Sequence, residues 1–181
     1  QALALFDISP DHDLNIMRAN QDLAHITQAV LIGMMAVLED EKPDRILVHG
    51  DTTTTFAAAL AGFYKKIPVG HVEAGLRTGD RYAPYPEEIN RKLTDGLCDL
   101  HFAPTQSAAD NLRREDIDPK GISITGNTVV DALLLVARKL RNDESLNNSV
   151  AAAFPFLSAD KQMVLVTGHR RENFGSGFER I

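Results

Sequence analysis

Residues 45–72 read RILVHGDTTTTFAAALAGFYKKIPVGHV and contain the repeating unit of the fold. The apolar runs RILVH (45–49) and PVGHV (68–72) have the length and composition of buried strands, and residues 52–66 between them are typical of a helix. Gly50 and Asp51 mark a turn where the first run ends. A strand, a helix and a second strand in this order form a right-handed crossover, so we expect two parallel strands.

The same alternation continues on both sides of this unit. We expect further strands at 100–103, 122–125 and 163–167, and further helices at 22–40, 87–97, 105–115 and 128–140. Residues 142–159 contain polar residues and Pro155, which favours a looser connection. Strands that alternate with helices build a parallel sheet, so the sequence predicts an α/β fold with helices on both faces of that sheet.

The composition is that of an ordinary globular protein. With 181 residues, 44% of them apolar, the chain can bury a core of one-domain size. Its net charge of -6 argues against a nucleic-acid or acidic-membrane surface. Apolar stretches such as Ala29–Leu38 are too short to span a bilayer, so we expect a cytoplasmic protein. Cys98 is the one cysteine, which excludes an intramolecular disulfide, and no spacing suggests a metal site.

Ionisable residues follow three of the expected strands. His49-Gly50-Asp51 ends the first, His71-Val72-Glu73 ends the second, and the run GHRRE (168–172) follows the last. Ligands of doubly wound sheets bind beyond the carboxyl ends of the strands. We therefore expect a functional site where these three segments meet.

Most of these candidates also have a purely structural interpretation. Asp51 precedes four threonines and could be the N-cap of the helix at 52–66. Glu87 and Glu88 follow Pro86 and suit the first turn of a helix, while His169 suits a turn. Glu73 has no helix start to cap, so a partly buried functional carboxylate is the favoured interpretation there.

The sequence lacks the common nucleotide and nucleophile motifs. It contains no dinucleotide fingerprint, no P-loop and no nucleophile elbow. The remaining carboxylates, histidines and arginines suit proton transfer beside an anionic ligand. The candidate phosphate partners are Arg77, Arg81, Arg91, Arg170 and Arg171.

Several longer runs resemble one enzyme family. VHGDTTTT (48–55) and GHVEAGLRTG (70–79) are similar to motifs of the non-hydrolysing UDP-N-acetylglucosamine 2-epimerases, and so are PEEINR (86–91), ITGNT (124–128) and TGHRREN (167–173). The resemblance covers nearly the whole chain, in the family's order. It implies a glycosyltransferase-B type fold of two Rossmann-like domains, with the active site in the cleft between them.

The resemblance also implies how much of that fold is present. Residues 1–160 would be most of the first domain, without its first strand and its Gly-Thr-Arg-Pro-Glu loop. Residues 161–181 would begin the second domain or belong to an interdomain segment. We therefore expect the 181 residues alone to be inactive.

The implied reaction interconverts UDP-GlcNAc and UDP-ManNAc by elimination and re-addition of UDP through 2-acetamidoglucal, without a cofactor or a metal. Asp51, Glu73 and Glu87 would be the acid/base and oxocarbenium-stabilising set. His169 and Arg170 would contact the diphosphate or leaving group, and Arg91 would orient Glu87 or meet phosphate.

The resemblance further implies a homodimer that serves cell-surface polysaccharide biosynthesis. Two rival functions remain. One is a hydrolysing relative that releases free ManNAc and UDP, and the other is a non-catalytic module that binds nucleotide sugars.

Overall fold

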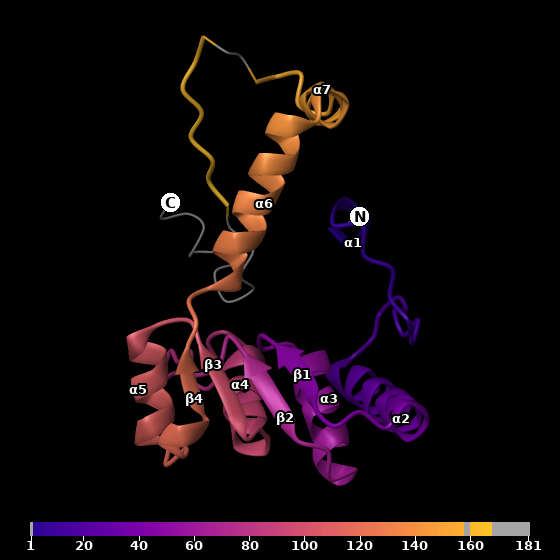
Figure 1. The fold of residues 1–181 in the computed structure, drawn as a ribbon, viewed down its shortest axis with the longest axis vertical. Helices are drawn as coiled ribbons and strands as arrows, with labels where there is room; N and C mark the ends of the chain where they lie inside the picture. The colour runs from indigo at the N-terminus through magenta and orange to yellow at the C-terminus, as the bar shows by residue number, and fades with distance from the viewer. Residues whose placement is uncertain (1, 158–159, 168–181) are drawn as a thin grey trace. The chain divides into compact units, whose positions relative to one another are not determined.

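The structure is a computed structural model that describes residues 2–157 and 160–167. The chain divides into two compact units. The larger comprises residues 8–127, and the smaller combines residues 1–7 with 128–181. The two units are described separately below (Figure 1).

A four-stranded parallel sheet forms the centre of the larger unit (Figure 1). Its strands, in the order β1-β2-β3-β4, are β1 (Ile46–His49), β2 (Val69–Val72), β3 (Leu100–Ala103) and β4 (Ile122–Ile124). In the register of the sheet, Val48 pairs with His71, which pairs with His101. The carboxyl ends of all four strands therefore lie at one edge of the sheet.

Helices connect consecutive strands. They are α3 (Thr53–Tyr64), α4 (Glu87–Leu97) and α5 (Gln106–Arg114), and a short 3-10 helix, η1 (Pro119–Gly121), precedes β4. Each strand is added on the same side of the previous one, so right-handed crossovers place α3, α4 and α5 on one face (Figure 1). Leu47, on the opposite face, is 63% exposed. The expected α/β class with a parallel sheet is confirmed, but the three crossover helices share a single face and do not cover both faces as the sequence predicts.

Small side chains fill much of the core between sheet and helices. The two buried clusters are Val48, Ala59 and Val69, and, beside β3 and α5, Ala74, Ala103, Ala108, Ala109 and Leu112. Alanines let the helices approach the sheet closely, as close packing of an interior requires.

Helix α2 (Leu23–Glu41) begins where the sequence predicts, with Asp22 accepting a hydrogen bond from the His25 N–H. Its 19 residues and mean hydropathy of 1.3 meet the length and composition of a bilayer span, contrary to the sequence-based expectation. Val30 and Leu38 are buried, and α2 packs against α3. Among the described residues, however, only 11% of that stretch is buried, so α2 contacts α3 with part of its surface and is not a mostly buried core helix.

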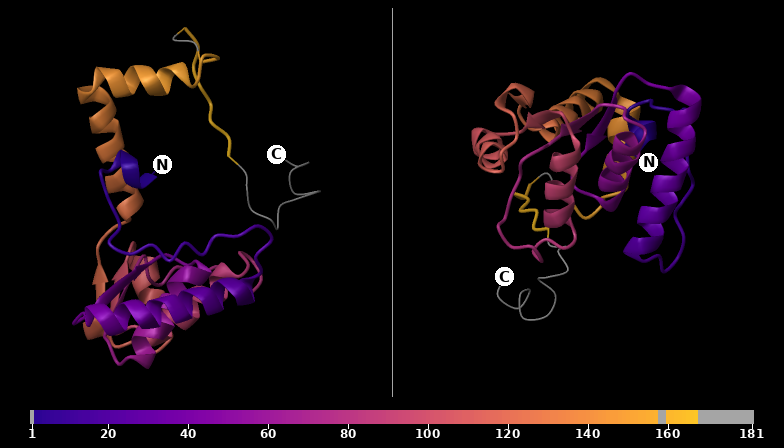
Figure 2. Two further views of the ribbon diagram at one scale, coloured as in Figure 1. Left: turned by 90° about the vertical axis from the view of Figure 1, so that its right-hand side faces the viewer. Right: turned by 90° about the horizontal axis from the view of Figure 1, so that it is seen from below.

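The smaller unit contains α1 (Ala2–Leu5), α6 (Thr128–Asn142) and α7 (Glu144–Ala152) (Figure 2). The prediction of a loose connection at 142–159 is wrong for the stretch that forms α7, because Asp143 caps that helix by accepting from the Leu146 N–H. The strand expected at 163–167 is not formed, and Met163 and Val164 are exposed. A strand requires a neighbour for its hydrogen bonds, and these residues have none among those described. The boundary at residue 160 stays a prediction.

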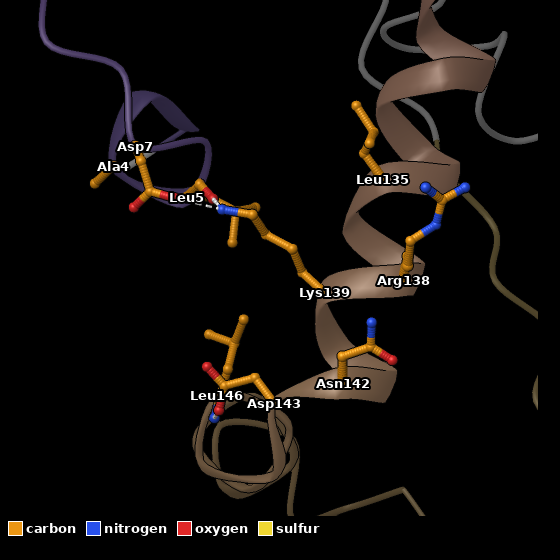
Figure 3. A pocket seen from close by; sticks show the side chains of 9 residues that line it. All are labelled: Ala4, Leu5, Asp7, Leu135, Arg138, Lys139, Asn142, Asp143 and Leu146. Atoms are coloured by element: carbon orange, nitrogen blue, oxygen red, sulfur yellow. Dashed lines mark hydrogen bonds and ion pairs between the residues drawn. The ribbon is translucent and has the colours of Figure 1, made fainter.

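A pocket in the smaller unit is lined by residues of α1, α6 and α7 (Figure 3). Lys139 on α6 donates from Nζ to the Leu5 carbonyl and to Asp7 Oδ2, each at 2.7 Å. The Lys139 ammonium therefore already has two acceptors, and Arg138 is the other basic residue that lines the pocket.

Candidate active site

Two of the predicted site residues follow neighbouring strands at the carboxyl edge of the sheet. Asp51 follows β1 and Glu73 follows β2. The Gly50 N–H donates to the Val72 carbonyl at 3.0 Å, and the Glu73 N–H donates to the Phe102 carbonyl at 3.0 Å. These bonds continue the ladder past the strand ends, so both carboxylates project from ordered backbone at one edge.

Asp51 is held by helix α4 and does not cap α3. The interpretation of Asp51 as an N-cap is wrong, because Thr52 caps α3 by accepting from the Thr55 N–H. Asp51 Oδ2 instead accepts hydrogen bonds from Arg91 Nε at 3.0 Å and Nη2 at 2.7 Å. The Asn90 side-chain amide donates to the Asp51 carbonyl at 2.9 Å. Both the carboxylate and the backbone of Asp51 are therefore fixed.

Glu73 adopts a backbone conformation that side chains rarely adopt. Its φ is +71°, in the left-handed region, where a residue with a Cβ is strained. Such strain is concentrated at functional sites, because the surrounding structure must hold it. The Glu73 side chain is 28% exposed, and its Oε2 lies 3.5 Å from His49 Nε2. Glu73 is thus the partly buried carboxylate that the sequence indicates.

The loop after Glu73 packs closely against α5. Gly75 has a φ of +83°, and a Cβ there would lie 2.3 Å from the Ala108 carbonyl oxygen. The Asn111 side-chain amide donates to the Gly75 carbonyl at 2.8 Å. Only glycine combines this conformation with this close approach.

Glu88 is a buried residue that binds neighbouring groups of the site. It is not an exposed acid in the first turn of α4. Its side chain is 0% exposed, and it accepts bonds from the N–H groups of Thr78 at 3.0 Å and Gly79 at 3.1 Å. It also accepts from Arg91 Nη1 at 3.0 Å. Burial alone would raise the pKa of Glu88, but the two backbone bonds and the Arg91 charge more than offset it and lower that pKa.

Arg91 therefore joins Asp51 to Glu88. It does not orient Glu87, the first of the two alternatives that the sequence leaves for it. Glu87 lies partly buried in the first turn of α4, one turn before Asn90 and Arg91. The role predicted for Glu87 stays a prediction.

A second buried ionic group, not predicted from the sequence, lies beneath these residues. Asp95, 0% exposed, contacts His71 Nδ1 at 2.6 Å and Arg77 Nη2 at 2.7 Å. Arg77 also binds Glu115 Oε2 at 2.6 Å, so two carboxylates already accept from its guanidinium, and its candidacy as a phosphate partner stays a prediction. Asp95 falls four residues after Arg91 on α4, so the two residues share one side of the helix.

Of the remaining predicted residues, His169, Arg170 and Arg171 lie outside the described residues, and their roles stay predictions, as does that of the exposed Arg81. Within the described part of the chain, no group of three or more His, Cys, Asp or Glu side chains could hold a metal ion. The described site thus offers two partly buried carboxylates on adjacent loops. Carboxylates in such a place can accept a proton and can stabilise a developing positive charge.

Comparison with known proteins identifies the family of this chain. The family model of UDP-N-acetylglucosamine 2-epimerase matches residues 1–181. The chain is 57% identical over 181 residues to the UDP-N-acetylglucosamine 2-epimerase of Salmonella typhimurium and 58% identical to that of Yersinia pestis. In each case the match covers 100% of this chain and 48% of the relative. The chain therefore spans about half the length of these relatives.

Solved structures give the same result. The UDP-GlcNAc 2-epimerase from Neisseria meningitidis bound to UDP-GlcNAc superposes with a TM-score of 0.91 at 51% identity, covering 99% of this chain and 48% of that chain. The Methanocaldococcus jannaschii enzyme in complex with UDP-GlcNAc and UDP gives 0.77 at 41% identity, covering 85% of this chain and 41% of that chain. The expected glycosyltransferase-B type fold is confirmed, and this chain is about half of it. The chain belongs to the UDP-N-acetylglucosamine 2-epimerase family.

Proposed function

We propose that the protein containing this chain is a non-hydrolysing epimerase that interconverts UDP-GlcNAc and UDP-ManNAc. The family membership supports epimerisation. The structures of relatives bound to UDP-GlcNAc, and to UDP-GlcNAc with UDP, support the choice of ligands. The motifs at 48–55 and 70–79 support the non-hydrolysing type through their resemblance to that group.

The proposed chemistry explains why carboxylates are needed. The hydrogen at C2 of the sugar is not adjacent to a carbonyl, so it becomes acidic only as UDP leaves C1 and positive charge develops on the ring. One carboxylate removes the proton while another stabilises that charge, and 2-acetamidoglucal and UDP form. UDP then adds back, and a proton returns to the other face of C2. Inversion therefore requires more than one acid/base group.

One observation carries the proposal: two partly buried carboxylates project from adjacent strand ends, one fixed by Arg91 and one on a strained backbone. Arg91 orients the Asp51 carboxylate through two hydrogen bonds to Oδ2, which suits electrostatic stabilisation of a developing positive charge. Glu73 Oε2 lies 3.5 Å from His49 Nε2, and among the described residues no arginine pairs with this carboxylate. Glu87 is the third member of the set through its place at the start of α4.

The test uses the protein expressed from the complete coding region that includes these 181 residues. Incubation with UDP-GlcNAc in deuterium oxide, without added NAD or metal, should give UDP-ManNAc labelled at C2, detected by proton NMR. Free ManNAc as the main product would instead identify a hydrolysing enzyme. Epimerisation without deuterium at C2 would contradict the elimination.

Substitutions then test the assigned residues. Asp51→Asn, Glu73→Gln and Glu87→Gln should each lower kcat by about 100-fold or more, the usual contribution of a general acid or base. Asp110→Asn is the matched control, because Asp110 pairs with Arg113 on the exposed side of α5. Near-normal kcat values in all three site variants would show that these carboxylates are structural and not catalytic.

We also propose that the protein is a cytoplasmic homodimer that supplies UDP-ManNAc for cell-surface polysaccharides. The support is the family resemblance together with the acidic, mixed-charge composition. Sedimentation equilibrium of the complete protein tests the dimer, since a monomer at micromolar concentration would contradict it.

A further inference from the structure

Helix α4 buries polar side chains where a core helix normally buries apolar ones. Its buried residues are Glu88, Asn90, Arg91, Thr94 and Asp95, while Leu93 is 46% exposed. Glu88, Arg91 and Asp95 follow at intervals of three and four, so they share one side of the helix. Burying an ion costs free energy unless the ion is paired. Each buried ion of α4 should therefore have a partner that offsets this cost.

The partners of the Asp95 carboxylate among the described residues come from β2 and the loop that follows it. Asp95 Oδ1 lies 2.6 Å from His71 Nδ1, and Oδ2 accepts from the Gly75 N–H at 3.3 Å and from Arg77 Nη2 at 2.7 Å. Burial would raise the pKa of Asp95, but the His71 hydrogen bond and the charges of His71 and Arg77 outweigh it and lower that pKa. Asp95 is therefore ionised at neutral pH.

Both ring nitrogens of His71 face acceptors. His71 Nε2 lies 2.7 Å from the Gly50 carbonyl oxygen, which can only accept a hydrogen bond. The Asp95 carboxylate at Nδ1 is likewise only an acceptor. Two N–H groups are needed to satisfy both, so the geometry assigns the imidazolium form to His71. The other charged group of this cluster, Arg77, lies across Asp95, and His101 on β3 bonds the Asp95 carbonyl at 2.9 Å.

Through His71, Asp95 thus reaches both loops of the candidate site. The Gly50 carbonyl belongs to the peptide that leads into Asp51. Gly75, whose N–H is bonded directly, lies two residues after Glu73. The first connection fixes the start of the Asp51 loop, and the second fixes the end of the Glu73 turn.

We propose that Asp95 is a positioning residue for the reaction, acting through the His71 imidazolium and the Gly75 N–H to fix the two catalytic loops relative to each other. This inference rests on the proposed function and extends it to residues that touch neither the sugar nor the nucleotide. A displacement of about 1 Å in a reacting group can cost about 100-fold in rate, so tight control of the two loops has a large kinetic effect.

The kinetic test compares three variants of the complete protein. Asp95→Asn keeps the size of the side chain and its capacity for hydrogen bonds, but it removes the charge that holds His71. We expect kcat to fall about tenfold for Asp95→Asn and about 100-fold for Asp95→Ala, with KM within about twofold of wild type in both. Asp99→Asn is the matched control, since Asp99 pairs with Arg45 on the surface at the opposite edge of the sheet.

Nitrogen-15 NMR of labelled histidine provides a readout that a merely structural role would not change. His71, assigned by its loss in His71→Gln, should show two protonated nitrogens at pH 7 in wild type and one in Asp95→Asn. If Asp95→Ala does not fold, Asp95→Asn carries the kinetic test. A kcat for Asp95→Asn within twofold of wild type, or a neutral His71 in the wild-type protein, overturns the proposal.

The two proposals fail in different ways. Wild-type protein that does not epimerise UDP-GlcNAc defeats the proposed function, while the NMR signal of His71 still reports on the Asp95 pair. Epimerisation at a normal rate in both Asp95 variants defeats the positioning role alone.

Discussion

Replacement of Arg91 by methionine should destabilise the protein by about 3 kcal/mol. Breaking a buried ion pair by removing one partner costs roughly 3–5 kcal/mol, because the other charge stays buried and unpaired. Arg91 serves two carboxylates, Glu88 at 0% exposure and Asp51 at 30%. Asp51 can recover hydration, and Glu88 keeps its bonds to the N–H groups of Thr78 and Gly79. Both facts place the expected loss at the lower end of that range.

Lowering the pH should reduce the difference in stability between wild type and Arg91→Met. The folded pKa of Glu88 lies below its ordinary value of 4.5, so its contribution to stability is present above pH 4.5 and is lost as the pH falls through the folded pKa. Loss of Arg91 raises that folded pKa towards the ordinary value. The gap between wild type and Arg91→Met should therefore be largest near pH 7 and should shrink below pH 4.5.

Urea unfolding followed by circular dichroism measures the effect, with the free energy of unfolding compared at equal m-values. Arg113→Met is the matched control. Arg113 forms an exposed pair with Asp110, at 41% and 45% exposure, and its loss should cost less than about 1 kcal/mol. Arg91→Lys should be intermediate, because an ammonium cannot reproduce the three N–H bonds of the guanidinium. If Arg91→Met lowers the free energy of unfolding by less than about 1 kcal/mol, Arg91 does not stabilise the protein as the buried partner of Glu88 and Asp51.

Two further predictions follow from single residues. Glu73→Gly should abolish epimerase activity. It should leave the free energy of unfolding unchanged or raise it by up to about 1 kcal/mol, since glycine relieves the strain of a φ of +71°. A clear loss of stability would show that the backbone there is unstrained. Desolvation, with the charges of Asp95 and Asp99, raises the pKa of the Cys98 thiol to about 12. A disulfide reagent at pH 8 should therefore label Cys98 slowly in the folded protein and quickly in urea, and equal rates would contradict this.

The elements of the larger unit could be predicted because their signals are local. Thr105 caps α5 as its sequence position indicates, by accepting from the Ala108 N–H. The apolar run at 100–103 is strand β3 at those same residues. In each case a few neighbouring residues determine the structure, so no knowledge of the rest of the chain is needed.

The errors arise where structure depends on distant partners or on neighbouring alternatives. Asp51 and Thr52 are both good N-cap residues. Thr52 caps α3 because Arg91, 40 positions away, binds the Asp51 side chain. The run at 163–167 has the composition of a strand, but it forms none without a partner strand. Helix α7 was not predicted because the polar residues and Pro155 favour a loop, although Asp143 is an ordinary N-cap residue.

The candidate site was only partly predictable for the same reason. Asp51, Glu73 and Glu87 were identified from motifs, and the structure places Asp51 and Glu73 on adjacent loops. Asp95 escaped notice, because a charged residue on an amphipathic helix is normally expected to face solvent. Only the fold reveals that His71 and Arg77, 24 and 18 positions earlier, make the opposite orientation favourable.

The polar face of α4 also explains why stability and catalysis should be linked in this protein. An apolar face would bury the helix at lower cost, but it could not bond the Gly75 N–H, the Asp51 carbonyl or the Asp51 carboxylate. Each ion on this face needs a partner from a site loop, and each loop needs the helix to hold its backbone groups. Substitutions on α4 should therefore lower both stability and kcat. Because Glu73 makes few bonds, substitutions there should lower kcat alone, and that contrast separates the scaffold from the chemistry.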